Sequence, residues 1–169
     1  MDNTFIEHMV RKDDKPARIM KKIAFVSALF IVNFLAFTML TSWFSVFVVA
    51  SALSVFFFWR RIDREYEYIY TDGAIDVDVI YGQSARKRLL SADARDFQFI
   101  AWAKSGTYRN QIEASYDKTI DAGKGGIRDE SYVGVLTKGE KTYKLIFEPD
   151  DRMVAALKKY IPRKFEARP

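Results

Sequence analysis

The sequence predicts an α+β membrane protein, in which a transmembrane α-helical hairpin precedes a small β domain closed by a C-terminal α-helix. Three observations predict this fold class. Between Ile23 and Trp59 there is no Asp, Glu, Lys, Arg or His. After Arg64 the hydrophobic pattern changes to a period of two, which is typical of strands. From Asp150 the period lengthens to that of an amphipathic helix.

The N-terminal segment, residues 1–20, is expected in the cytoplasm. Four of its apolar residues share one face at helical spacing; they are Phe5, Ile6, Met9 and Val10. This spacing predicts a short amphipathic helix that lies on the inner membrane surface. A loosely ordered chain end is the alternative.

The uncharged stretch is too long for one membrane span. A spanning helix needs ~20 apolar residues, whereas this stretch as a single helix would measure roughly 55 Å. Thr41–Trp43 is its most polar cluster and predicts a turn. We therefore expect two transmembrane helices within residues 21–61, at about 21–41 and 43–61.

The charges beside the hairpin predict its orientation. Basic residues flank both spans, with Arg18, Lys21 and Lys22 before the first and Arg60, Arg61 and Arg64 after the second. The turn carries no charge. Basic residues stay on the cytoplasmic side, so we expect a two-span cell-membrane protein with both termini in the cytoplasm. A cleaved signal peptide is disfavoured because the apolar run continues to a basic cluster. Transport is disfavoured because the apolar stretch holds no ionisable residue.

A β domain is predicted over residues 62–162. Residues 65–70 and 74–81 alternate with period two around Asp72-Gly73, which indicates a β-hairpin. The second run places two sets of side chains on opposite faces: Ile75, Val77, Val79 and Tyr81 on one, and Asp76 and Asp78 on the other.

Further strands follow with less regular patterns. The expected pieces are a third strand at 86–90, a fourth at 94–102, a possible fifth at 112–116, and a second hairpin made by 131–136 and 142–147. A Gly-rich loop covers residues 121–126, and the order within 104–128 stays open.

A helix is predicted at about 150–161. Asp150 and Asp151 follow Pro149, which is typical of a helix start. Met153, Leu157, Tyr160 and Ile161 then form an apolar stripe. Pro162 ends the pattern, and residues 163–169 are expected to be a flexible tail.

These segments resemble the bacterial pleckstrin-homology-like (PH-like) membrane proteins. The resemblance is carried by Tyr66–Tyr81 with its Asp-Gly turn, by Arg86–Leu90, and by the helix from Asp150. More narrowly, Glu65–Tyr68 and Lys87–Arg95 are similar to small two-span bacterial proteins of unknown function. The resemblance implies a small PH-like β-barrel or sandwich closed by the C-terminal helix, and it implies little about function.

The amino-acid composition excludes several kinds of catalytic and metal-binding site. The chain has no cysteine and a single histidine, His8, which excludes disulfides, Cys-type zinc sites and a His-dependent triad within one chain. Three acidic groupings remain as alternatives for metal or acid–base work: Asp76 with Asp78, Asp93 with Asp96, and Asp117, Asp121 and Asp129. No phosphate-loop, EF-hand or nucleophile-elbow motif accompanies them. We expect no enzymatic activity, no metal and no cofactor.

The basic run Arg86, Lys87 and Arg88 is the better functional candidate. Together with Arg60, Arg61 and Arg64 it predicts contacts with anionic lipid headgroups or with a partner. The alternative is an exposed strand whose bases pair with Asp93 or Asp96. A net charge of +5 is too small to indicate nucleic-acid binding.

The expected function is that of a non-enzymatic adaptor or regulatory binding module, held at the cytoplasmic face of the lipid bilayer and bound to an unidentified protein partner. Two alternatives stay open. One is an anionic-lipid-binding or membrane-organising protein. The other is an accessory subunit of a membrane complex.

Overall fold

The computed structural model describes residues 4–12, 15–62, 64–82 and 85–169. The chain divides into two compact units. One unit is a helical hairpin, residues 14–64, together with residues 81–85. The other unit holds the remaining residues and is built mainly of β-strands.

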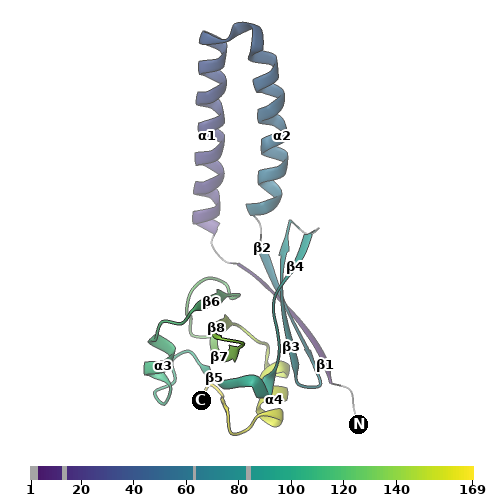
Figure 1. The fold of residues 1–169 in the computed structure, drawn as a ribbon, viewed down its shortest axis with the longest axis vertical. Helices are drawn as coiled ribbons and strands as arrows, with labels where there is room; N and C mark the ends of the chain where they lie inside the picture. Colours follow the sequence, from purple (N-terminus) through teal and green to yellow (C-terminus); the bar gives the residue numbers. More distant parts are fainter. Residues whose placement is uncertain (1–3, 13–14, 63, 83–84) are drawn as a thin grey trace. The chain divides into compact units, whose positions relative to one another are not determined.

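The helical unit is an antiparallel pair of long helices (Figure 1). Helix α1 (Lys15–Met39) leads through a 3-10 turn, η1 (Thr41–Trp43), into helix α2 (Phe44–Ile62). The predicted turn at Thr41–Trp43 is therefore confirmed. Helix α1 starts earlier than expected, which is compatible with Pro16 because proline is tolerated in the first helical turn.

Aromatic and polar side chains join the two helices. The rings of Phe25 and Phe58 stack with centroids 4.0 Å apart. Asn33 Nδ2 donates hydrogen bonds to Ser51 Oγ at 2.7 Å and to Leu29 O at 2.8 Å. Ser51 and Asn33 thus join the helices near their middle, as small and polar residues do inside membranes.

Both helices are long and apolar enough to cross a membrane. The apolar segments Arg18–Met39 and Thr41–Phe58 each have a mean hydropathy of 1.9. Only 6% of the first and none of the second is buried within the protein. Core helices of soluble proteins are mostly buried, so this exposed apolar surface needs lipid or another protein to cover it.

The first sheet, here called the N-terminal sheet, has four strands in the order β1-β2-β3-β4. Its strands are β1 (Phe5–Arg11), β2 (Arg64–Thr71), β3 (Ala74–Tyr81) and β4 (Ala85–Asp93). The predicted hairpin around Asp72-Gly73 joins β2 to β3. Ile75, Val77 and Val79 are buried as expected.

The predicted amphipathic helix near the N-terminus is wrong. Residues Phe5–Arg11 form β1, which pairs antiparallel with β2 from Phe5↔Thr71 to Arg11↔Glu65. Ile6 and Val10 are buried, a spacing of four that fits a strand face as well as a helix face. Seven residues make a marginal helix, and β2 offers alternate residues of this segment backbone hydrogen bonds instead.

The second sheet, here called the C-terminal sheet, has the order β6-β8-β7-β5-β9. Its strands are β5 (Phe97–Trp102), β6 (Lys118–Asp121), β7 (Tyr132–Lys138), β8 (Lys141–Phe147) and β9 (Phe165–Glu166). A short 3-10 turn, η2 (Ala94–Asp96), connects the two sheets through the chain. The described strands thus form two separate sheets and no closed barrel, which corrects the barrel expectation.

Tyr68 ties the two sheets together. Its ring meets that of Phe147 edge-on at 5.9 Å. Its hydroxyl, fully buried, donates a 2.6 Å hydrogen bond to Ala122 O. Burial raises the pKa of the Tyr68 hydroxyl above its ordinary value. The sheets therefore pack face to face around an aromatic core that includes one satisfied polar atom.

The other face of the C-terminal sheet is covered by helix α3 (Arg109–Glu113). The possible strand at 112–116 is therefore wrong. Ile112 of α3 packs with Phe99 and Val133, and Tyr108 stacks on Phe99 at 4.4 Å. Lys144, mostly buried, donates to Ile112 O and satisfies a carbonyl at the end of this short helix. Burial lowers the pKa of the Lys144 amine.

Helix α4 (Asp151–Tyr160) confirms the predicted C-terminal helix within one residue at each end. Asp150 caps it, since its Oδ1 accepts a 2.9 Å hydrogen bond from Met153 N. Met153 and Leu157 are fully buried. The apolar stripe read from the sequence therefore faces the core.

The C-terminal tail, expected to be flexible, is partly a strand. Phe165–Glu166 form β9, which pairs parallel with β5. Ile100 N donates to Lys164 O at 2.8 Å, and the Phe165 ring stacks on Tyr132 at 5.7 Å. An aromatic anchor and the open edge of β5 order this segment.

Candidate functional site

The predicted basic run on β4 lies against carboxylates of the neighbouring strands. Arg86 Nη2 is 2.5 Å from Glu67 Oε2. Arg88 bridges two acids, with Nη1 2.9 Å from Asp76 Oδ2 and Nε 2.8 Å from Asp78 Oδ1. The acidic partners are therefore on β2 and β3. These pairs neutralise much of the charge that was expected to meet lipid headgroups.

The expected pairing with Asp93 or Asp96 is not seen in the described residues. Asp93 instead caps η2, accepting a 2.8 Å hydrogen bond from Arg95 N. Arg64 lies at the start of β2 with its guanidinium 5.6 Å from the centre of the Tyr81 ring. Lys87 is exposed on β4. The side chains of Arg60 and Arg61 lie outside the described part of the structure, so their contacts with lipid headgroups or a partner stay predictions.

Glu67 is the most unusual member of this charged face. Its side chain is 1% exposed although it carries a carboxyl group. Burial raises the pKa of Glu67 first of all, and a hydrogen bond with the Glu7 carboxyl raises it further. The nearby Arg86 opposes both effects on the Glu67 pKa. Glu67 of β2 is thus a buried carboxyl group between acidic side chains of β1 and β3 and the guanidinium of Arg86.

The other acidic groupings have structural contacts. Asp117 Oδ2 accepts from Thr142 N at 2.8 Å. Asp121 accepts from Gly123 N at 3.2 Å and from Gly126 N at 3.1 Å, which shapes the Gly-rich loop. In the described part of the chain, no three His, Asp or Glu side chains gather where they could hold a metal ion.

Strand β1 forms one edge of the N-terminal sheet among the described strands. Asp72 N donates to Thr4 O, so the backbone at Thr4 faces β2. Because hydrogen-bonded and open positions alternate in an antiparallel pair, four later residues turn their N–H and C=O groups to the open edge. These residues are Phe5, Glu7, Met9 and Arg11. An edge of this kind is a template for another strand.

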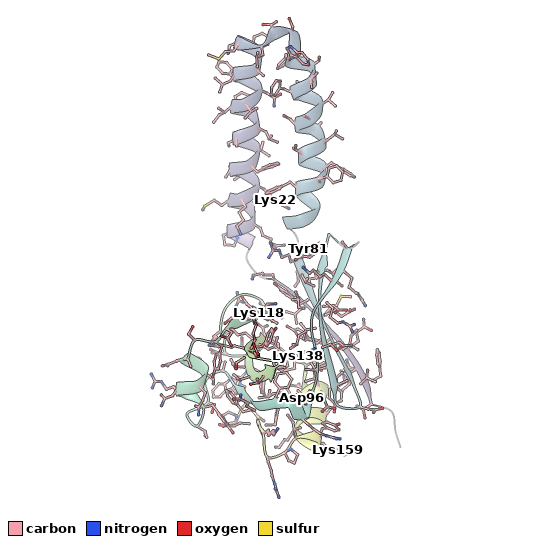
Figure 2. The ribbon with its side chains drawn as sticks, in the orientation of Figure 1. Lys22, Tyr81, Asp96, Lys118, Lys138 and Lys159 are labelled. Carbon is pink, nitrogen blue, oxygen red and sulfur yellow. The ribbon has the colours of Figure 1, made fainter. Side chains whose placement is uncertain are left out.

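A hollow lies between the beginning of β1 and helix α4. It encloses about 760 Å³ and is bounded by Thr4 and Ile6 on one side and by Ala155 and Ala156 on the other. Three basic side chains line it: Arg95, Arg152 and Lys159. Lys159 projects from α4 (Figure 2). Among the described residues of this lining Asp72 is the single acid, and its carboxylate accepts from Thr4 N at 2.9 Å.

A second hollow lies at the other end of β1. It encloses about 630 Å³ and is bounded by His8, Met9 and Val10 of β1 and by Val154 of α4. Its charged lining is mainly acidic: Glu130, Glu148, Asp150 and Asp151, against Lys124 and Arg168. Lys124 is shared by two of these acids, at 3.0 Å from Glu130 and 3.4 Å from Glu148.

We call these two hollows, which lie between β1 and α4, the β1–α4 groove. Local sequence positions both of its walls. The Asp150 cap fixes where α4 begins. At the other end Tyr160 packs on Gly73, so closely that a Cβ there would lie 2.1 Å from the ring. The Arg95 guanidinium covers the Tyr160 ring at 4.6 Å.

Sequence reasoning missed this groove. Its walls come from opposite ends of the chain, and neither contains a motif. The residues of Phe5–Arg11 alternate in exposure only in the folded structure. In the sequence their apolar residues fall in two adjacent pairs, a spacing that indicates a helix. Arg152 and Lys159 lie two turns apart on α4. Arg95 belongs to η2 and joins them only because its guanidinium lies over the Tyr160 ring.

Comparison with known proteins gives one match. A family model described as a bacterial PH-like domain (DUF6106) matches residues 2–167. No curated protein and no solved structure matches the chain.

Proposed function

Because the chain belongs to the bacterial PH-like domain family, we propose that it is a non-enzymatic, membrane-anchored binding module that holds an extended segment of a partner protein along β1. The observation that carries this proposal is the open edge of β1 beside the β1–α4 groove. Strand addition supplies affinity through backbone hydrogen bonds, and neighbouring pockets supply specificity.

The membrane anchor rests on the helical hairpin. Two exposed apolar helices of sufficient length, joined by an uncharged turn, favour insertion in a bilayer. The hairpin connects β1 to β2, and these strands pair in one domain. Chain segments on both sides of a spanning hairpin must therefore lie on the same side of the membrane. The basic residues at its ends favour the cytoplasmic side.

Two observations support binding rather than catalysis or lipid recognition. The paired carboxylates Asp76 and Asp78, a candidate acid–base pair by sequence, are both bound by Arg88. The same ion pair reduces the positive charge that Arg88 can offer to anionic headgroups. By contrast, no strand in the described part of the chain pairs with the open edge of β1.

The orientation can be tested by cysteine labelling, since the chain has no native cysteine. Ser42 lies in the turn between the helices, and Glu140 is exposed in the turn between β7 and β8. A membrane-impermeant thiol reagent applied to intact cells should label Ser42→Cys and not Glu140→Cys. Labelling of Glu140→Cys alone would reverse the proposed orientation.

The binding function can be tested with two substitutions at one position. Met9 turns its N–H to the open edge, so Met9→Pro removes an edge donor and leaves the bonds to β2 in place. Met9→Thr changes the side chain but keeps the N–H. The wild type and each full-length variant would be purified from the native membrane in gentle detergent. Proteins that co-purify in stoichiometric amount would be identified. Each would then be tested for binding to the purified wild type and variants.

We expect a partner that binds the wild type and Met9→Thr and is lost with Met9→Pro. Thermal unfolding of each variant would establish that β1 stays folded. A partner retained by folded Met9→Pro would contradict strand addition. Binding of anionic vesicles by all three proteins, without a protein partner, would replace the proposal with a lipid-binding function.

A further inference from the structure

The charged side chains that line the β1–α4 groove differ in sign between its two ends. Of the residues that the structure describes, three bases and one acid line the hollow at the Thr4 end. The hollow at the Val10 end is lined by four acids and two bases, besides His8. The charge therefore changes sign along β1, whose seven residues from Phe5 to Arg11 separate the two hollows.

The bases at the Thr4 end are available to a ligand. Lys159 is exposed in the last turn of α4. Arg152 is bound to Asp150 through Nε at 2.9 Å, yet its side chain remains 73% exposed. Arg95 is exposed, lies over the Tyr160 ring and lines the hollow. Carboxylates are the natural partners of such donors.

We propose that the partner segment is itself dipolar, with carboxylate side chains at the end that meets Arg95, Arg152 and Lys159 and basic side chains at the end that meets the acidic hollow. This inference rests on the proposed function, since it assumes that an extended segment adds to β1. Charge complementarity of this kind fixes the register and direction of an added strand and disfavours segments of the wrong polarity.

The test uses two peptides of identical composition and opposite charge order. Each has about nine residues, enough to cover β1, with a Val-Thr alternating centre, two Lys at one end and two Glu at the other. Acetylated and amidated ends remove the terminal charges. Binding of each fluorescein-labelled peptide to the full-length protein in detergent is followed by fluorescence anisotropy at low salt.

We expect one charge order to bind about tenfold more tightly than the other, because two favourable charge contacts at partly exposed sites are each worth up to about 1 kcal/mol. Lys159→Glu should abolish or reverse this preference. Lys158→Glu is the matched control. Lys158 is exposed in the same last turn of α4 but does not line the groove, so the preference should survive.

The outcomes separate this inference from the function on which it rests. Equal binding of both peptides, or a preference that Lys159→Glu leaves unchanged, overturns the dipolar segment. If both orders bind equally and both are lost with Met9→Pro, strand addition stands and the charge inference falls. Absence of binding by either peptide also overturns the inference, and the native partner test with Met9→Pro then decides the function by itself.

Discussion

Gly73 lies in the turn between β2 and β3 with a φ of 101°, a conformation that side chains with a Cβ rarely adopt. It also supports the Tyr160 ring, which would lie 2.1 Å from an added Cβ. We expect Gly73→Ala to lower the free energy of unfolding by about 3 kcal/mol through backbone strain and overpacking together. Thermal or denaturant unfolding of the full chain in detergent measures this loss.

Gly139 provides the matched control for Gly73. It has a φ of 64° in the turn between β7 and β8, and nothing lies within 4 Å of its added Cβ. Gly139→Ala should therefore cost only the backbone term, about 1 kcal/mol. Equal losses at the two positions would mean that the approach of Tyr160 is unimportant.

The raised pKa of Glu67 makes the stability of the β domain depend on pH. Since its folded pKa lies above the ordinary value of 4.5, the folded state binds its proton more tightly than the unfolded state. The stability from this group is fully present below pH 4.5 and is lost as the pH rises through the folded pKa. We expect Glu67→Gln to reduce this fall in stability, measured by thermal unfolding from about pH 4 to about pH 8.

Glu65 is the matched acid on the same strand. It is partly exposed and lies 3.7 Å from Arg11 Nε. Glu65→Gln removes a carboxyl group from the same strand without touching the buried Glu67, and it serves as the control. The charged groups that set the Glu67 pKa are Glu7 on β1, Asp78 on β3 and Arg86 on β4. An unchanged slope in Glu67→Gln would assign the pH dependence to another group.

At the scale of the elements, local patterns predicted those parts whose partners lie nearby in the chain. The turn at Thr41–Trp43, the β2–β3 hairpin and the capped helix α4 are all of this kind. Their signals are polarity within an apolar run, an Asp-Gly pair and an Asp cap. Each acts over a few residues, so a single sequence reveals it.

Elements whose partners are distant in the sequence could not be predicted from such local patterns. Strand β1 pairs with β2, which follows the whole helical hairpin, and β9 pairs with β5 across most of the domain. The spacing of Ile6 and Val10 fits a helix as well as a strand, and only the pairing of β1 with β2 decides between the two. The groove was missed for the same reason, since it requires β1 and α4 to be placed first.

Strand β9 depends on one aromatic anchor. Phe165 is mostly buried and stacks on Tyr132. We expect Phe165→Ala to lower the free energy of unfolding by about 3 kcal/mol, as for other buried Phe-to-Ala changes. It should also open residues 163–169 to proteases, which limited proteolysis with mass spectrometry would detect. The exposed Arg163 is the control position, and Arg163→Ala should keep the tail protected.

At the scale of the whole molecule, the helical hairpin is an insertion within the β domain. The chain leaves β1, passes through α1 and α2, and returns as β2, which pairs with β1. The last pair of this ladder, Arg11↔Glu65, lies next to both ends of the hairpin. A hairpin inserted between paired strands is tethered through two chain segments, whereas a terminal span would be tethered through one.

This arrangement predicts how the β domain can be separated from the helical hairpin. A short Gly-Ser loop in place of residues 13–63 would join β1 to β2 as an ordinary hairpin, because antiparallel neighbours need only a few connecting residues. We expect this variant to be soluble and to unfold cooperatively. A chain that begins at residue 65 lacks β1 and leaves the core side chains that pack beneath Ile6 and Val10 exposed. It should unfold at a lower temperature or aggregate through the bared edge of β2. Equal stability of the two chains would show that β1 is dispensable, and the docking edge would then have to be sought on another strand.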